Sequence, residues 1–318
     1  MMRQPVTCAR PGAFTRFHGP EAVLMAAVLA AILAGCDGGG GMAHPATLPD
    51  LSGLAWVGGG EFLGVHDAKD TPEKRNWPRV SLIRLPQSEK EGLIWRPLEV
   101  SFPGAPGPAS DLESACTLPR GRGFLLCESG QEGDNRRIFH VRLADGELRV
   151  VSWAKWPVPV KNVEATEACE VGGELVFLHA ERAEGMPATT VRWARLSLDP
   201  LAFGPFDGVP YEARDPKGPG ARPLVALAAD PDGVLYGVSA FDSGRDDGPY
   251  RSTVWRIGRV TADARGRPRV TLGPAQHLAD VAGFKVESIA VRVLPDGCKQ
   301  IYIGTDDEHF GGVLRPIP

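Results

Sequence analysis

The sequence predicts an all-β fold, a β-propeller, and three observations support this prediction. One short pattern occurs five times, in copies that begin about 61, 51, 61 and 62 residues apart. Each copy contains two apolar runs that are separated by a glycine-containing turn. No helical pattern of useful length follows residue 35. Repeats of about 55 residues that form antiparallel four-stranded units are typical of propeller blades.

The first apolar run of each copy is expected to form the innermost strand of a blade. The copies begin with Asp50–Leu54, Asp111–Ala115, Asn162–Thr166, Pro223–Leu227 and Lys285–Ile289. A single copy cannot bury both of its faces, so the copies must pack on one another.

The second run of each copy predicts the neighbouring strand of the same blade. These runs are Glu61–Val65, Phe124–Cys127, Leu175–Leu178, Val234–Val238 and Gln300–Gly304. Turn residues that suit hairpins lie between several of the paired runs, namely Gly58–Gly60, Gly172–Gly173, Asp232–Gly233 and Asp296–Gly297.

A third strand is predicted in each of the first four copies by alternating β-branched and aromatic residues. These segments are Arg79–Leu85, Arg137–Val141, Thr190–Leu196 and Thr253–Ile257. The last copy ends within its third strand, Phe310–Pro318, so we expect the segment before Asp50 to supply an outer strand and close the ring. The direct count is five blades of four antiparallel strands, and a sixth would require a copy too eroded to recognise.

The N-terminal segment has the pattern of a bacterial lipoprotein signal peptide. Basic residues precede an apolar run, Ala22–Leu33, that ends in Leu-Ala-Gly-Cys at Cys36. This ending resembles the lipobox, which implies that Cys36 is lipidated, with palmitate among the acyl chains. The run is too short to span a bilayer. We therefore expect a signal peptide at 1–35, a lipidated cysteine and tether at 36–47, and a propeller at 48–318.

Composition and location limit the partners of this protein. With a net charge of −4, the chain has no basic surface for nucleic acid. The expected location is the bacterial cell envelope, outside the cytoplasm, and the choice between inner and outer membrane stays open. Disulfides are permitted there, and a tight turn at Gly121–Arg122 would place Cys116 opposite Cys127. The alternative is that these cysteines are two small buried residues.

Two copies contain motifs that resemble a known family. They are Asp-Leu-Glu-Ser-Ala at Asp111–Ala115 and Val-Glu-Ser-Ile-Ala at Val286–Ala290. With the blade-like spacing and the lipoprotein leader, they make residues 48–318 similar to the phytase-like propeller proteins, described by an "esterase-like activity of phytase" domain. The resemblance implies hydrolysis of phosphoesters or esters.

Polar residues are predicted to gather at one mouth of the central channel, where the innermost strands begin and the second strands end. The starts of the innermost strands carry Ser52, Glu113, Glu164, Val225 and Glu287. The ends of the second strands carry His66, Glu128, His179, Ser239 and Thr305. Further acids follow closely, namely Asp67, Glu181, Asp242, Asp306 and Asp307.

Strand pairing suggests which of these residues meet. A turn at Gly172–Gly173 places Glu164 opposite Glu181 and His179 opposite Thr166, which gathers the two glutamates and the histidine on one face. His179, Glu164, Glu181 and His66 are the candidate catalytic residues, because crowded carboxylates raise one another's pKa values and so become acids and bases.

The remaining acids could hold a hard cation such as Ca²⁺, which prefers six to eight oxygen ligands. The candidate metal ligands are Glu113, Glu128, Glu287, Asp306 and Asp307. With such an ion and a histidine, the mouth could support hydrolysis of phosphoesters or esters.

A noncatalytic function is the alternative interpretation. Repeated polar residues at strand ends often satisfy loop backbone, and the chain has no Gly-x-Ser-x-Gly, Gly-x-x-x-x-Gly-Lys or His-Glu-x-x-His motif. The protein would then be a scaffold of the cell envelope, tethered through Cys36, that binds a small molecule or an envelope protein at the mouth.

Overall fold

Five antiparallel sheets follow one another along the chain in a computed structural model. The structure describes residues 47–69, 71, 76–88, 90–104, 107–131, 136–245, 247–307 and 311–317. In the first four sheets each of the first three strands pairs with the next along the chain, as in a meander. This order follows from short connections between neighbouring apolar runs.

The first two sheets have four strands each. The first contains β1 (Gly53–Gly58), β2 (Glu61–Val65), β3 (Val80–Arg84) and β4 (Ile94–Pro97). The second contains β5 (Leu112–Thr117), β6 (Phe124–Glu128), β7 (Arg137–Ala144) and β8 (Glu147–Lys155), with the short 3-10 helix η1 (Pro119–Gly121) between β5 and β6.

The other three sheets differ in their outer strands. The third contains β9 (Val163–Val171), β10 (Glu174–Glu181), β11 (Ala188–Leu198), β12 (Leu201–Phe203) and β13 (Asp207–Glu212). The fourth contains β14 (Ala221–Ala229), β15 (Val234–Phe241), β16 (Arg251–Ala262) and β17 (Pro268–Ala282). The fifth has β18 (Val286–Val293), β19 (Lys299–Thr305) and β20 (Leu314–Pro316).

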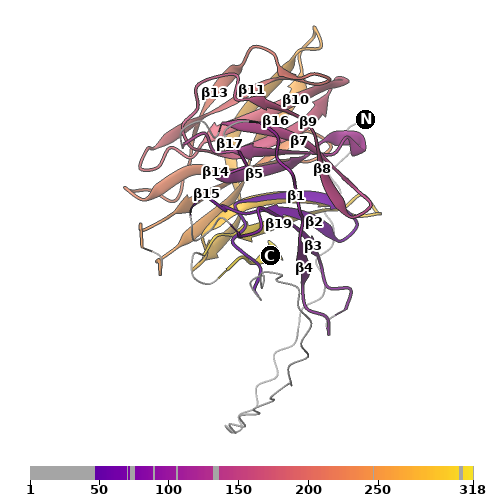
Figure 1. Cartoon of the computed structure of the whole chain (residues 1–318). Helices are drawn as coiled ribbons and strands as arrows, with labels where there is room; N and C mark the ends of the chain where they lie inside the picture. The colour runs from indigo at the N-terminus through magenta and orange to yellow at the C-terminus, as the bar shows by residue number, and fades with distance from the viewer. Residues whose placement is uncertain are drawn as a thin grey trace, which may run out of the picture. The chain divides into compact units, whose positions relative to one another are not determined.

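The innermost strands form a closed ring. β1 contacts β5, β5 contacts β9, β9 contacts β14, β14 contacts β18, and β18 contacts β1 again. Figure 1 shows this closure as the indigo start of the described chain lying beside its yellow end. The predicted five-bladed propeller is therefore confirmed.

The ring closes through the segment before β1, but not in the predicted way. Leu48 and Leu51 bond to the fifth sheet through their backbone, by Gly312 N to Leu48 O at 2.8 Å and by Leu51 N to Thr305 O at 2.9 Å. The described residues before β1 form no strand, so the expectation of an added outer strand was wrong for them. Leu51 packs in a cluster that joins blades one and five.

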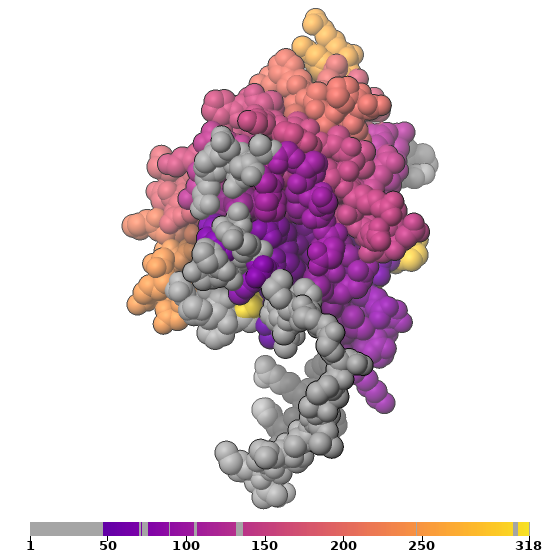
Figure 2. All heavy atoms as spheres, in the orientation of Figure 1, coloured from indigo at the N-terminus to yellow at the C-terminus, as the bar shows by residue number. Residues whose placement is uncertain are grey.

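Close contacts with the neighbouring innermost strand, or with the segment just before it, explain a glycine in the second strands of three copies. An added Cβ at Gly64 would lie 2.7 Å from Leu51 Cδ2, and one at Gly237 would lie 2.6 Å from Leu224 Cδ1. At Gly304 it would lie 2.3 Å from Ser288 Oγ. Clusters of buried apolar side chains lie between neighbouring sheets. Figure 2 shows the described residues as coloured spheres in the orientation of Figure 1.

The predicted Cys116–Cys127 disulfide is wrong, since both thiols are free and buried. The connection between β5 and β6 is longer than a two-residue turn, because the last strand pair before it joins Thr117 to Phe124. Cys116 therefore pairs with Leu125, and Cys127 pairs with Ser114.

The predicted signal peptide at 1–35, Cys36 and the tether up to residue 46 lie outside the described residues. Among the described residues, we find no helix with the length and apolar character that crossing a membrane requires.

Candidate functional site at the channel mouth

The mouth of the channel is formed where the innermost strands begin, and three of these beginnings are bulged. Glu113, Glu164 and Glu287 each lie at a shift in register between the first strand of the blade and the second. A bulge inserts an extra residue, which turns a side chain away from the regular alternation. Asp111 and Asn162, two residues before the first two glutamates, have φ angles of 62° and 55°. Asp and Asn tolerate this left-handed conformation better than most residues.

Three carboxylates converge on one side of the mouth. One oxygen from each of Asp67, Asp111 and Glu113 lies within 4.8 Å of the others. Lys69 Nζ lies 3.5 Å from Asp67 Oδ2 and 3.4 Å from Asp111 Oδ1. Within the described part of the chain, the Glu113 side chain makes no hydrogen bond or ion pair, although it is only 9% exposed. Burial, and then the negative charges of Asp67 and Asp111, raise the pKa of Glu113 well above its usual range.

Glu164, in the third blade, is buried beside an arginine. Its Oε1 accepts a hydrogen bond from Arg182 Nη1 at 2.7 Å. Its Oε2 is buried and has no hydrogen-bond partner among the described residues. Burial raises the pKa of Glu164, and the positive charges of Arg182 and Arg222 partly oppose this.

Glu287 belongs to a network of buried charges from the fourth and fifth blades. Arg222 donates to Glu287 Oε1 through Nη1 and to Asp242 Oδ2 through Nη2, both at 2.8 Å. Lys285 Nζ lies 3.6 Å from Glu287 Oε1 and 3.0 Å from Asp306 Oδ2. Burial and the charge of Asp306 raise the pKa of Glu287 well above its ordinary value.

Glu128 lies in a different environment from these acids. Its carboxylate forms an ion pair with Arg137, with Nη2 donating to Oε1 at 2.6 Å, and both side chains are 0% exposed. Ser110 N donates to Oε1 at 3.1 Å, and Arg137 N and Nε donate to Oε2 at 2.8 and 3.1 Å. These bonds occupy both oxygens, so Glu128 is a structural residue rather than a free metal ligand.

His66 is also engaged by its surroundings. Its Nδ1 donates to the Asp50 carbonyl at 2.7 Å, which leaves Nε2 to accept from Ser81 Oγ at 2.8 Å. Burial lowers the pKa of His66 to about 4, against the opposing effect of the Asp50 bond. The imidazole is therefore neutral and holds the first blade together.

His179 is placed among aromatic rings. Its ring centroid lies 5.1 Å from that of Trp156, 5.2 Å from Phe206 and 6.2 Å from Phe177. Both ring nitrogens are buried and have no hydrogen-bond partner among the described residues. Burial, and then the charge of Arg192, lower the pKa of His179 to about 4.

The predicted grouping of Glu164, His179 and Glu181 does not occur. His179 does face Thr166, as predicted, but the bulge places Glu181 opposite Val163 rather than Glu164. Glu181 Oε1 accepts from Lys161 N at 2.8 Å.

The two aspartates after β19 have different roles. Asp306 faces Lys285, whereas Asp307 accepts from Lys285 N at 2.8 Å and from Thr305 Oγ1 at 2.5 Å. Burial raises the pKa of Asp307. The hydrogen bond from Lys285 N to Asp307 holds the loop backbone in place. Of the five predicted metal ligands, Glu113, Glu287 and Asp306 lie at the charged mouth, whereas the carboxylates of Glu128 and Asp307 accept hydrogen bonds from backbone N–H groups.

Several charged residues of the mouth were not predicted from the sequence. Asp111 and Lys285 occupy the position two residues before the motif glutamate, where four of the five copies carry a polar residue. This recurrence is a signal that could have identified them. Arg222 has no such signal, because the irregular pairing between Arg222 and Ala226 shifts it relative to the other copies.

Fold and site together define a five-bladed β-propeller with a charged channel mouth. The fold is similar to that of a putative oxidoreductase (glucose dehydrogenase) from Thermus thermophilus, at 17% identity and a TM-score of 0.38, covering 85% of this chain and 97% of the other. An endo-arabinase from Bacteroides thetaiotaomicron has 13% identity and a TM-score of 0.43, with coverage of 86% and 94%. An exo-1,5-alpha-L-arabinanase from a bovine ruminal metagenomic library has 12% identity and a TM-score of 0.43, with coverage of 86% and 95%.

Searches by sequence add no relatives. No protein-family profile matches the chain. No curated protein matches it either. The resemblance to phytase-like propellers therefore stays a prediction from the motifs.

Proposed function

We propose that the channel mouth binds a divalent cation, Ca²⁺ in the first place, and that the protein hydrolyses phosphoesters or esters at this site. The observation that carries the proposal is the convergence of Asp67, Asp111 and Glu113 within 4.8 Å. Oxygens that share a calcium ion at 2.3–2.6 Å can lie up to about 5 Å apart, so the group fits such an ion. Glu113 supports it further, because it has no partner of its own among the described residues.

The same mouth carries positive groups that suit an anionic substrate. The Arg182 side chain is 25% exposed, and Lys285 lies in the neighbouring network. Arg182 can contact an oxyanion while it stays near Glu164. Glu287 has a raised pKa and can hold a proton for a leaving group. A bound divalent cation supplies a Lewis acid and an activated water.

Calcium titration of the purified protein tests the cation site. We expect Glu113→Gln to weaken calcium binding at least tenfold in isothermal titration calorimetry. Lys69→Met should strengthen it about fivefold, because the ammonium group repels a second cation beside Asp67 and Asp111. Glu147→Gln is the matched control and should change nothing, since that side chain is 66% exposed. Equal calcium affinities of the wild type and Glu113→Gln would contradict the proposed cation site.

Hydrolysis is tested separately with p-nitrophenyl phosphate and p-nitrophenyl acetate, in calcium and in chelator. We expect turnover that calcium supports and that Glu113→Gln reduces together with calcium affinity. Calcium binding without turnover of either substrate would contradict the hydrolase and leave the cation site in place.

A second candidate function is noncatalytic binding of a ligand or an envelope protein at the mouth. The observation that favours it is that neither His66 nor His179 is available as a base, the first through its bonds and the second through its aromatic surroundings. For either function, we propose that lipidation of Cys36 tethers the propeller to a membrane of the cell envelope. Metabolic labelling with palmitate, compared between the wild type and Cys36→Ala, tests the tether.

A further inference from the structure

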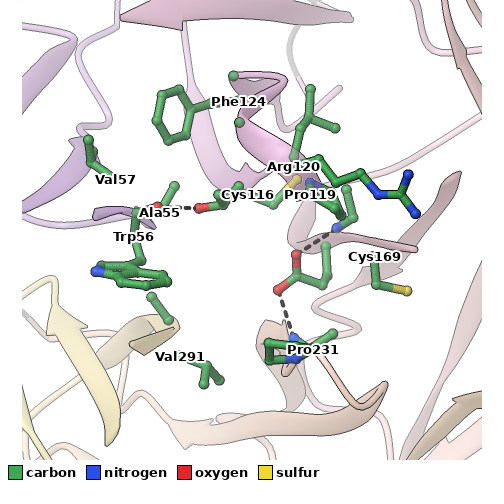
Figure 3. Close-up of a pocket in the computed structure, with 18 of the residues that line it drawn as sticks. Ala55, Trp56, Val57, Cys116, Pro119, Arg120, Phe124, Cys169, Pro231 and Val291 are labelled. Atoms are coloured by element: carbon green, nitrogen blue, oxygen red, sulfur yellow. Dashed lines mark hydrogen bonds between the residues drawn. The ribbon is translucent and has the colours of Figure 1, made fainter. Parts of the chain in front are cut away.

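The other end of the channel contains a cavity of about 720 Å³, which is within the range of small-molecule sites. Its walls come from the later parts of the innermost strands, with Val57, Cys116, Ala168, Ala229 and Val291 among them. Figure 3 shows the lining, with Trp56 and Cys169 on opposite sides. The wall is mainly apolar, and its charged residues are Arg120, Arg142, Glu167, Glu170 and Asp230.

One carboxylate, that of Glu167, lines this cavity and is only 8% exposed. Glu167 Oε1 accepts from Ala168 N at 2.6 Å, and Oε2 accepts from Ala229 N at 2.8 Å, which connects β9 to β14. Each carboxylate oxygen can accept a second hydrogen bond, so the group has capacity left. Glu167 forms no ion pair with any described residue.

The other acids in the wall are already neutralised by cations. Glu170 pairs with Arg120 and lies 3.5 Å from Arg122 Nη2. Asp230 Oδ2 lies 2.6 Å from Lys299 Nζ. Glu167 is therefore the acid of the described wall that lacks a cation.

Trp56 adds an aromatic ring to the same wall. Its side chain lines the cavity and is half-buried, and the indole Nε1 donates to Gly59 O at 3.2 Å. A carboxylate and an indole face across an apolar cavity are the groups that recognise organic ammonium ions. We propose that this cavity binds a small organic ammonium ion with an apolar body, whose charged nitrogen bonds to Glu167 and whose body contacts Trp56.

Benzylammonium is the probe, and benzyl alcohol and phenylacetate are its neutral and anionic counterparts. We expect the purified protein to bind benzylammonium at least tenfold more tightly than benzyl alcohol, and phenylacetate most weakly. Glu167→Gln should remove the preference for the ammonium ion. Glu147→Gln, whose exposed side chain does not line the cavity, is the control and should retain it. Equal binding of the three probes, or the same preference in Glu167→Gln, would overturn the proposal.

A measurement on the wild type alone covers the case in which Glu167→Gln fails to fold. Burial raises the pKa of Glu167 to about 8, so an arriving ammonium ion should displace a proton at neutral pH. The thiols of Cys116 and Cys169 also line the cavity, but burial raises their pKa values further above neutrality, so they remain protonated. The binding enthalpy should therefore vary with the ionisation enthalpy of the buffer. A buffer-independent enthalpy for benzylammonium would contradict the assignment.

Discussion

Two glutamates on β9, only three residues apart, illustrate how differently the two ends of the channel are built. Glu164 lies in a bulge at the mouth, bonds to Arg182, and is surrounded by other charges. Glu167 lies in the regular part of the strand, opposite Leu178, and among the described residues its carboxyl group bonds to two backbone N–H groups. The mouth is a network of charged side chains, whereas in the far cavity Glu167 is a buried carboxyl group for which the described residues supply no cation.

The difference shows that burial alone does not define the character of a carboxyl group. Both pKa values are raised by burial, but at Glu164 the arginines oppose the effect, and at Glu167 two backbone hydrogen bonds do so. At the mouth, the charges of Arg182, Arg222 and Lys285 oppose the effect of burial on the pKa values of Glu164 and Glu287. Without a cation, Glu167 holds its proton at neutral pH.

The largest expected effect is the pH dependence of the free energy of unfolding that Glu167, in the far cavity, causes. The unfolded chain ionises Glu167 above about pH 4.5, but the folded protein holds the proton up to about pH 8. Between these values the unfolded state binds fewer protons, so the free energy of unfolding falls as pH rises and levels off above pH 8. At 1.36 kcal/mol per pKa unit, the contribution lost is on the order of 4 kcal/mol. Urea unfolding from pH 4.5 to 8.5 measures it.

Glu167→Gln separates this contribution from others. Glu113 and Glu287 also have raised pKa values, so the variant should still lose stability as pH rises, but less steeply than the wild type. His66 lowers the free energy of unfolding as pH falls from about 6.5 to about 4. This loss is the same in the wild type and in Glu167→Gln, so it cancels when the two proteins are compared. Parallel curves for the two proteins would show that Glu167 titrates normally.

The next largest effect is the loss of stability when the ion pair between Glu128 and Arg137, beneath the mouth, is broken. Arg137→Met leaves Glu128 buried without its cation, which should lower the free energy of unfolding by about 3–5 kcal/mol at pH 7. Urea unfolding measures the loss. Arg149→Met, which removes an ion pair with two-thirds exposed partners, is the control and should leave the unfolding midpoint unchanged. A small effect of Arg137→Met would mean that Glu128 takes up a proton or reaches water when its partner is removed.

The repeated motif predicted most of the fold. Four of the five copies begin just before an innermost strand, the fourth copy begins two residues inside β14, and each second run matches the next strand. The outer strands were not located, because exposed edge strands such as β12 and β13 carry little apolar pattern. The three-stranded fifth sheet depends on contacts between the two ends of the described chain, which no local pattern contains.

The site was predicted less well, and the reason is the bulges. Counting back from Gly172–Gly173 gives the correct partner for His179, but one extra residue beyond it separates Glu164 from Glu181. A shift of one residue reverses the face on which a side chain lies. Glu167 was not predicted, because the motif ends before it and because its contact with Ala229 of β14 joins segments far apart in the sequence.

The smallest effect concerns His179, which belongs to neither end of the channel. Its two ring nitrogens are buried without hydrogen bonds among the described residues, and its neighbours are Trp156, Phe177 and Phe206. A phenyl ring removes the unsatisfied polar atoms and keeps most of the shape. His179→Phe should therefore raise the free energy of unfolding by about 1 kcal/mol, which thermal denaturation measures.

The same variant decides between the two interpretations of this histidine. A structural His179 predicts that His179→Phe is more stable and that its calcium affinity and its hydrolysis of p-nitrophenyl phosphate equal those of the wild type. A catalytic His179 predicts loss of hydrolysis in a variant that remains folded and binds calcium. His179→Asn is the matched control, because it keeps polar atoms in the aromatic cluster and should be less stable than the wild type. Stabilisation by Phe and destabilisation by Asn would assign His179 to the packing between blades and leave the chemistry to the carboxylates of the mouth.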